Sequence, residues 1–158
     1  METVVIRKAR PAEAPLLSQL AFRSKSYWGY PSDFMEACRA ELSVDPSRMD
    51  SGDHDCRVAV SGAAILGFYT LERLKHGDFE LEALFVEPGH IGTGVGRMLI
   101  EHAVEALSGH GASRLIIQGD PNARRFYIAA GARQVGTRES QSIPGRQLPL
   151  FEITIEAK

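Results

Sequence analysis

The chain has 158 residues, of which 44% are hydrophobic and 24% are charged, and its formal net charge is −2. These values are typical of a globular protein, and the length fits a single domain over residues 1–158. The weak charge, with Lys and Arg scattered along the chain, disfavours nucleic-acid binding, and the lack of an apolar run of about 18 residues disfavours a membrane span.

The cysteines and the beginning of the chain indicate a reducing compartment. Cys38 and Cys56 do not have the spacing of metal ligands, and residues 1–10 lack the apolar core of a signal peptide. We therefore expect a cytoplasmic protein with reduced thiols.

The first third of the chain predicts a strand, two helices and a loop. Residues 3–8 are strand-like, and Pro11 then opens a helix. The apolar face of this helix consists of Leu16, Leu17, Leu20 and Ala21. A turn at residues 27–31 ends the helix, and Ser32 is positioned to cap the next one. Residues 45–55 are polar and are expected to form a loop.

The middle of the chain predicts three strands, a helix and a fourth strand. Turn-forming residues separate the strands at 57–60, 65–71 and 79–86, which suggests an antiparallel meander. An amphipathic helix follows at about residues 95–107, and a short buried-type strand follows it at residues 114–118.

The last third predicts one more helix and two strands. Asp120 and Pro121 form an N-cap and first-residue pair for a helix that closes at Gly131. Strands are expected near residues 133–137 and 150–156. Because hairpins alternate with one strand–helix–strand crossover, the chain predicts an α/β fold with a mixed sheet and helices on both faces.

Three alternating glycines, Gly92, Gly94 and Gly96, lie between an apolar strand and the helix at 95–107. Such a turn leaves backbone N–H groups free to bind an anion, so the sequence predicts a phosphate site. The dinucleotide-binding motif needs a third glycine that is absent in either register, and a P-loop needs a Lys and a hydroxyl-bearing residue that are absent after Gly96. Glycines that only make a tight turn are the alternative.

The run from Leu84 to Leu99 resembles the acetyl-coenzyme-A motif of the GCN5-related N-acetyltransferase (GNAT) family. It shares an apolar strand that ends in Val-Glu-Pro at residues 86–88, and Gly94 and Gly96 at the positions that open a helix. Ile91 stands where the family has Gln or Arg. One side chain that helps to hold the pyrophosphate in relatives is therefore absent, and backbone amides would have to suffice.

A second stretch, residues 122–132, is similar to a later motif of the family, in which Asn precedes a helix that contains Phe-Tyr and closes at Gly. The resemblance implies the acyl-CoA N-acyltransferase fold, a mixed, largely antiparallel sheet of six to seven strands with helices on both faces. It also implies acetyl-CoA as cosubstrate, without a metal. The residues that it assigns to the coenzyme are Phe85, Val86, Ile91, Gly92, Thr93, Gly94, Val95, Gly96, Arg97, Asn122 and Tyr127.

Glu82 is the candidate catalytic base. A carboxylate within an apolar strand is costly unless it faces a wet cleft or a partner. Strand alternation puts Glu82 on the face opposite to Leu81, Ala83 and Phe85. A surface Glu82 that only pairs with an arginine is the alternative, and Glu80 takes the role if the register is slipped.

The resemblance also implies two further contributions to catalysis. The family's strand before the phosphate turn splays from its neighbour, so N–H groups from Leu84 to Val86 are expected to meet the thioester carbonyl, with Phe85 and Val86 as the candidates. Tyr127 stands where many relatives keep a tyrosine near the coenzyme sulfur, and a phenol with an ordinary pKa near 10 is suited to protonate a departing thiolate. A Tyr127 that only packs on the sheet, and an Asn122 that only caps a helix, are the alternatives.

The family's acceptor site implies a role for two loops, at residues 27–30 and 140–146. Trp28 and Tyr30 present aromatic faces, which attract ammonium groups, unless they only plug the core. Arg146 is placed to select an amine that carries a carboxylate. The expected substrate-binding residues are thus Trp28, Tyr30, Glu82 and Arg146, and either loop also offers a homodimer contact.

We therefore expect an N-acetyltransferase that moves acetyl directly from acetyl-CoA to a primary amine of a small molecule or peptide, by general base and general acid catalysis. The alternative is a non-catalytic acyl-CoA-binding sensor of the same fold, which Ile91 favours. Acetylation of aminoacyl-tRNA is disfavoured by the net charge of −2. Neither nucleic acid nor a membrane is an expected partner.

Overall fold

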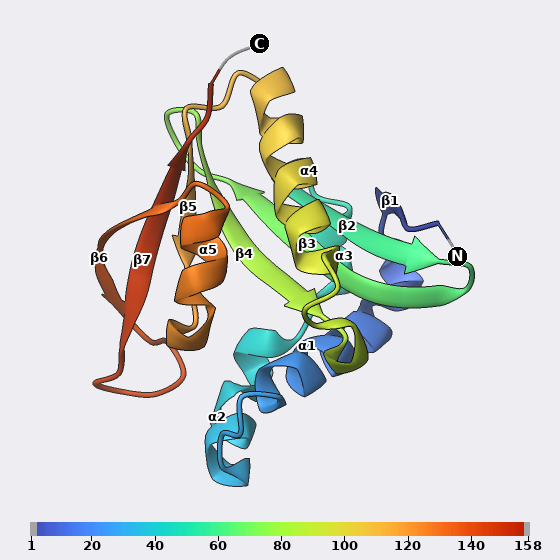
Figure 1. Cartoon of the computed structure of the whole chain (residues 1–158), viewed down its shortest axis with the longest axis vertical. Helices are drawn as coiled ribbons and strands as arrows, with labels where there is room; N and C mark the ends of the chain where they lie inside the picture. Colours follow the sequence, from blue (N-terminus) through green and yellow to red (C-terminus); the bar gives the residue numbers. More distant parts are fainter. Residues whose placement is uncertain (1–2, 157–158) are drawn as a thin grey trace.

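The computed structural model describes residues 3–156, which fold around one seven-stranded sheet (Figure 1). The strands stand in the order β1-β2-β3-β4-β5-β7-β6. Their bounds are β1 (Val5–Lys8), β2 (His54–Ser61), β3 (Ala64–Arg73), β4 (Asp78–Val86), β5 (Arg114–Gln118), β6 (Arg133–Glu139) and β7 (Gln147–Thr154). The α/β fold class and the number of strands that the sequence predicted are confirmed.

Helices connect the strands and cover the sheet. The α-helices are α1 (Ala14–Ser26), α2 (Ser32–Leu42), α3 (Pro46–Met49), α4 (Val95–Gly109) and α5 (Arg124–Ala129). Three short 3-10 turns, η1 (Pro11–Glu13), η2 (Pro88–His90) and η3 (Pro121–Ala123), precede or follow them. In the described part of the chain, no helix is both long enough and apolar enough to cross a bilayer.

The one parallel pairing in the described sheet joins β4 to β5, and all the others are antiparallel. The parallel register runs only from Asp78 opposite Arg114 to Leu81 opposite Ile117. Beyond this point β4 continues to Val86, while β5 ends at Gln118 and pairs with β7 on its other side. The two strands therefore separate over the second half of β4 (Figure 1).

Two apolar clusters hold the helices on opposite faces of the sheet. Under α4 and α5, Leu99 and Ile100 pack with Tyr69 and Phe151 of the strands. Under α1 and α2, a second cluster contains Leu17, Leu20, Met35, Cys38, Val58 and Phe68. Burying a Leu or Phe side chain contributes about 1.5–3 kcal/mol, so these clusters fix both layers on the sheet.

A β-bulge interrupts β4 at Glu82. Leu81 lies opposite Leu71 and Ala83 lies opposite Thr70, which leaves Glu82 as an extra residue. The prediction that Leu81 and Ala83 share one face of the strand is therefore wrong, because the bulge lies between them. Leu81 packs in the cluster under α4, whereas Ala83 packs in the cluster under α1 and α2.

Three other details differ from the sequence predictions. Leu16 was expected on the buried face of its helix, but it is 55% exposed, and Leu17 and Leu20 form the core. Ser32 is the first residue of α2 and makes no side-chain cap, because Pro31 holds the N-cap position. The predicted loop at 45–55 contains α3 and the start of β2.

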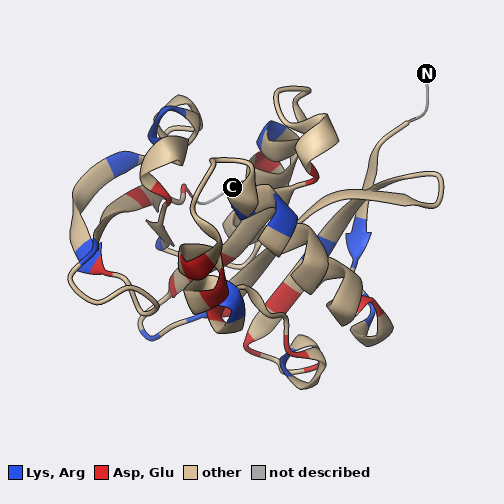
Figure 2. Ribbon diagram, turned by 90° about the horizontal axis from the view of Figure 1, so that it is seen from below, with Lys and Arg blue, Asp and Glu red and all other residues tan. Residues whose placement is uncertain are grey.

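Charged residues of both signs are interspersed over the ribbon (Figure 2), in keeping with the net charge of −2. Several of them form ion pairs between elements. Arg23 of α1 binds Glu87 at 2.6 Å, and Arg114 of β5 binds Asp78 of β4 at 2.9 Å. The second pair stands where β4 and β5 are still joined.

Candidate active site

The glycine turn before α4 has the geometry of an anion site. Gly92 and Gly94 have φ values of 84° and 96°, in the left-handed region that other residues rarely adopt. Gly94 is the N-cap of α4, and its carbonyl accepts the first intrahelical hydrogen bond from Met98 at 3.0 Å. The N–H groups of the first turn of α4 therefore lack helical partners and carry the positive end of the helix dipole.

Gly96 is needed for a different reason. A Cβ at this position would lie 3.0 Å from Cε1 and 3.3 Å from Cζ of Phe126, so a larger residue would force the Phe126 ring to shift by a few tenths of an ångström. By contrast, a Cβ at Gly92 or Gly94 would meet nothing within 4 Å. The first two glycines therefore serve backbone conformation, and the third serves packing.

A cavity of about 440 Å³ runs from this turn into the gap between β4 and β5. Of the site residues that the sequence predicted, its lining includes Trp28, Glu82, Phe85, Val86, Ile91, Gly92, Gly94, Gly96, Arg97, Asn122, Tyr127 and Arg146. Thr93, Val95 and Tyr30 do not line it. The Thr93 hydroxyl donates to the His90 carbonyl at 2.5 Å, and Val95 is only 4% exposed.

The separation of β4 from β5 exposes backbone donors on β4. Glu87 donates to Leu66 of β3 at 2.8 Å. Because the antiparallel ladder alternates, Phe85 also turns its N–H toward β3, whereas Leu84 and Val86 turn theirs toward the gap. The Val86 N–H has only a long contact, 3.4 Å to the Ser24 hydroxyl. The donor pair at the gap is therefore Leu84 and Val86, and the expectation for Phe85 is corrected.

Tyr127 lies at the inner end of the cavity. Its ring packs against Phe126 and Phe151, with centroid distances of 5.1 and 5.5 Å, and a Cβ at Gly119 would lie 3.1 Å from it. The residue is 7% exposed. Burial raises the pKa of the phenol, and the Asp120 carboxylate raises it further, so Tyr127 is protonated at neutral pH but is a weaker acid than the phenol of ordinary pKa that was expected from the sequence.

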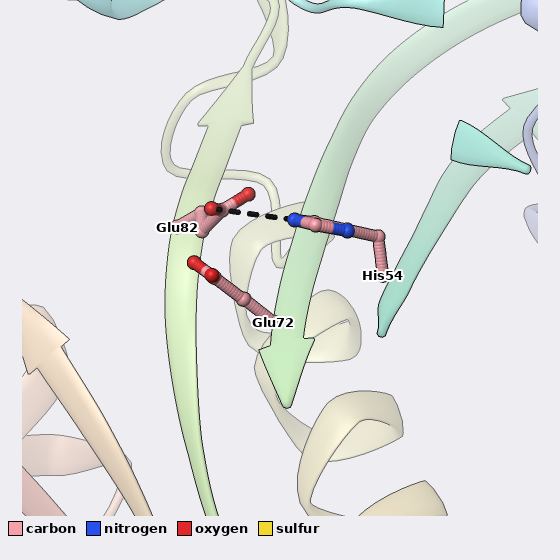
Figure 3. Close-up of side chains that lie close together, drawn as sticks. All are labelled: His54, Glu72 and Glu82. Atoms are coloured by element: carbon pink, nitrogen blue, oxygen red, sulfur yellow. Dashed lines mark ion pairs between the residues drawn. The ribbon is translucent and has the colours of Figure 1, made fainter. Parts of the chain in front are cut away.

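Glu82 points to the other face of β4, into a group of charged side chains. Arg48 of α3 donates to its Oε1 at 2.6 Å, and Nε2 of His54 lies 3.7 Å from the same atom (Figure 3). The Glu72 carboxylate, from the neighbouring strand β3, also points toward the Glu82 carboxylate. Burial and the Glu72 carboxylate raise the pKa of Glu82 to about 7, although Arg48 opposes this shift.

Arg48, His54 and Glu72 were not identified as site residues from the sequence. His54 was assigned to a polar loop, but it is the first residue of β2 and lies opposite Glu72 in the sheet. Its Nδ1 is buried and has no hydrogen-bond partner among the described residues. A metal-ligating trio of His54, Glu72 and Glu82 is close enough geometrically, within 4.8 Å, but the Arg48 guanidinium already contacts Glu82 and disfavours a second cation.

Tyr30 and Arg146 belong to a network at the rim of the cavity. The Tyr30 hydroxyl donates to Asp120 at 2.8 Å and accepts from Arg146 at 2.8 Å and from Asn122 at 3.0 Å. Lys25 binds the same Asp120 carboxylate at 3.3 Å. The network joins the loop before α2 to η3 and to the loop before β7. The cap of η3 is Asp120, not Asn122.

A second cavity, of about 480 Å³, lies on the α2 and α3 side of the sheet. Glu41, Glu82 and Gln118 line both cavities, so the two meet beside Glu82. One opening leads from the glycine turn, and the other leads from the Arg48 side. The arrangement can bring two different molecules together at β4.

Comparisons with known proteins agree with this geometry. The model of the acetyltransferase (GNAT) family matches residues 20–132. An uncharacterized N-acetyltransferase of Mycobacterium tuberculosis (strain H37Rv) is 33% identical over 103 residues, which are 63% of this chain and 62% of that protein. The chain thus matches a little under two thirds of this relative's length.

Solved structures share the fold. The PaiA N-acetyltransferase of Thermoplasma acidophilum, in complex with coenzyme A, is 18% identical with a TM-score of 0.77 and covers 96% of this chain and 99% of its own. An aminoglycoside 6′-N-acetyltransferase complexed with coenzyme A is 17% identical with a TM-score of 0.73, covering 98% of each chain. At these identities the likeness establishes the fold.

Proposed function

Because the chain belongs to the GNAT family of acetyltransferases, we propose that it transfers acetyl from acetyl-CoA directly to a primary amine of a small molecule or peptide. The observation that carries the proposal is the continuous cavity. It has free helix N–H groups at one end, a buried phenol inside, and a carboxylate with a pKa of about 7 where it meets the second cavity.

The glycine turn fits a pyrophosphate. The left-handed Gly92 and Gly94 aim the N–H groups at the start of α4 into the cavity, and such groups bind anions without cationic side chains. Arg97 adds a guanidinium at the rim that is 68% exposed and paired with Glu101 at 2.8 Å. Ile91 lines the cavity with an apolar side chain, so the coenzyme depends on the backbone here.

Each catalytic group has a separate task. The acetyl thioester supplies an activated carbonyl, and the Leu84 and Val86 N–H groups polarise its oxygen. Glu82 accepts the proton of the acceptor ammonium, since a base with a pKa of about 7 is ionised and still basic at neutral pH. Tyr127 donates a proton to the departing thiolate. Holding both reactants at one place supplies much of the rate.

The test is acceptor-dependent release of the coenzyme thiol, measured with acetyl-CoA and a panel of amines. Thiol release with a matching acetylated amine supports the proposal. Glu82→Gln should lower turnover about 100-fold or more and remove the acidic limb of the pH profile, as expected for loss of a general base. An unaltered acidic limb would reject the assignment of Glu82.

A non-catalytic acyl-CoA sensor is the second candidate. Ile91 favours it, because the side chain that assists the pyrophosphate in relatives is absent. Tight binding of acetyl-CoA with no thiol release for any amine would support the sensor.

We also propose that the protein is a single-domain cytoplasmic homodimer. The edge strand β6 is exposed at nearly every residue and is available to pair with a second copy. Light scattering after size exclusion tests the dimer, and a mass equal to one chain would reject it.

A further inference from the structure

The second cavity is the place for the acceptor if the first cavity holds the coenzyme. It lies between the α2–α3 segment and strands β3 and β4, and it opens onto the first cavity at Glu82 and Gln118. A molecule of about 480 Å³ or less can therefore reach Glu82 without crossing the coenzyme path. His54 also lines this cavity; its Nε2 lies 2.6 Å from the Arg48 guanidinium, and its Nδ1 is buried with no hydrogen-bond partner among the described residues.

The lining of this cavity is strongly acidic. Its carboxylates are Glu41, Asp45, Glu72, Glu80 and Glu82, and its guanidinium groups are Arg48 and Arg138. The lining contains no lysine. Five carboxylates against two guanidiniums leave an excess of negative charge, and a concave surface of one sign concentrates ions of the other sign.

The two guanidiniums do not reach all the carboxylates. Arg48 lies 2.6 Å from Glu82 and 3.8 Å from Glu72, and Arg138 lies 3.2 Å from Glu80. Glu41 accepts a hydrogen bond from the neutral Ser142 hydroxyl at 2.6 Å, and no ion pair to it is recorded among the described residues. Glu41 therefore offers an uncompensated charge where the two cavities meet.

The sequence suggested that Arg146 selects a carboxylate on the acceptor, whereas the lining of the second cavity favours a positive group. Arg146 lines the coenzyme-side cavity, donates to Tyr30 at 2.8 Å and stacks over the rings of Tyr30 and Phe34. Its guanidinium is thus already engaged. It also lies 4.0 Å from the Asp120 carboxylate, and the arginines near Glu82 in the described residues, Arg48 and Arg138, are paired with carboxylates as well.

We propose that the acceptor is a diamine or another amine with a second positive group, and that Glu41 binds this second group while Glu82 faces the reacting nitrogen. The proposal rests on the proposed function. Glu41 and Glu82 both line the region that the two cavities share, which suits a short aliphatic linker between the two nitrogens.

Three acceptors of equal chain length test the second charge. They are 1,4-diaminobutane, 1-aminopentane, in which a methyl group replaces the second ammonium, and 5-aminopentanoate, which carries a carboxylate instead. We expect kcat/KM for the diamine to exceed that for 1-aminopentane by about tenfold or more, as one charge-assisted hydrogen bond provides, and 5-aminopentanoate to be the poorest. Equal values for the diamine and 1-aminopentane would overturn the proposal.

Substitutions locate the second charge. Glu41→Gln should reduce the ratio of the two kcat/KM values severalfold toward one. Glu36→Gln is the matched control, because Glu36 also lies on α2 but pairs with Arg39 outside the cavity. A ratio that stays the same in Glu41→Gln would also contradict the proposal.

A binding measurement separates this proposal from the proposed function. Calorimetry with 1,4-diaminobutane and 1-aminopentane, on protein saturated with coenzyme A, should detect tighter binding of the diamine even if turnover is absent. Binding of the diamine without thiol release would reject the proposed enzymatic activity and support the site for the second positive group. Thiol release without a preference for the diamine would support the enzymatic activity and reject that site.

Discussion

The carboxyl group of Glu82 differs from the other acidic groups of β4 because a bulge turns it into a partly buried cluster. Its side chain is 22% exposed, and two neighbours act on it in opposite directions. Glu72 raises the pKa of Glu82 by repulsion and by sharing a hydrogen bond, and Arg48 lowers it. His54 contacts the same oxygen from β2 at 3.7 Å. The balance brings the pKa to about 7.

Removing either neighbour should move the acidic limb of the rate profile in a predictable direction. Glu72→Gln removes the repulsion, so the pKa of Glu82 falls, the base stays ionised at lower pH, and activity at pH 6 rises by about tenfold if the pKa reaches its ordinary range. Arg48→Gln removes the stabilising cation, so the limb moves to higher pH. The measurement is kcat/KM against pH for the wild type and both variants. Limbs that coincide in all three proteins would contradict the role of Glu82.

Tyr127 provides a second test at this scale. No hydrogen bond to its hydroxyl is recorded in the described part of the chain, so Tyr127→Phe should keep the ring packing against Phe126 and Phe151. We expect the free energy of unfolding to change by less than about 1 kcal/mol, while kcat falls about 100-fold because the thiolate loses its proton donor. Denaturant unfolding and steady-state kinetics check the two parts. Unchanged kcat would leave Tyr127 with packing alone.

Among the elements, the turn before α4 has the strictest requirements for particular residue types. Gly92 and Gly94 need positive φ values, and Gly96 needs the space beside Phe126. These requirements are local, so the glycine pattern predicted the turn and the helix start correctly. The bounds of β5 were also predicted correctly at Arg114–Gln118, because a short apolar strand between turns depends little on distant residues.

Gly94→Ala separates the anion site from general strain. Alanine at φ 96° is strained, so the variant should lose about 1 kcal/mol of stability and bind coenzyme A about tenfold more weakly. Gly111→Ala is the matched control, since Gly111 has φ 68° and open space around it but lies at the other end of α4. It should lose similar stability and keep its affinity. Equal affinities for all three proteins would count against the turn as the phosphate site.

Helix α3 and the start of β2 were not predicted from the sequence, for different reasons. Asp45 and Pro46 have the same cap and first-residue pairing as Asp120 and Pro121, and the Asp45 side chain indeed accepts from the Ser47 N–H, so α3 had a readable signal within an otherwise polar segment. The position of His54 had no such local signal in the sequence. A bulge between Ala59 and Val60 shifts the register of the hairpin, and this shift puts His54 opposite Glu72. No residue type in the sequence predicts it.

At the scale of the whole molecule, the proposed function depends on the parallel pair β4–β5 ending at Leu81 and Ile117. Beyond it the strands part, the first cavity enters from the glycine turn, and the second enters from the acidic side. The sequence predicted the layers, and most of the site residues that it predicted line the first cavity. It could not predict the group of charged side chains around Glu82, because Arg48, His54 and Glu72 come from three elements and meet only through tertiary packing and sheet register.

The most direct test of the account is binding of coenzyme A to the purified, folded protein by titration calorimetry. We predict one binding site per chain for the wild type, and a Kd about tenfold higher for Gly94→Ala. The heat is measured at two temperatures, because a binding enthalpy that is near zero at one temperature becomes detectable at another. If neither coenzyme A nor acetyl-CoA gives heat at either temperature, the first cavity is not a coenzyme site and the proposed acetyl transfer is wrong.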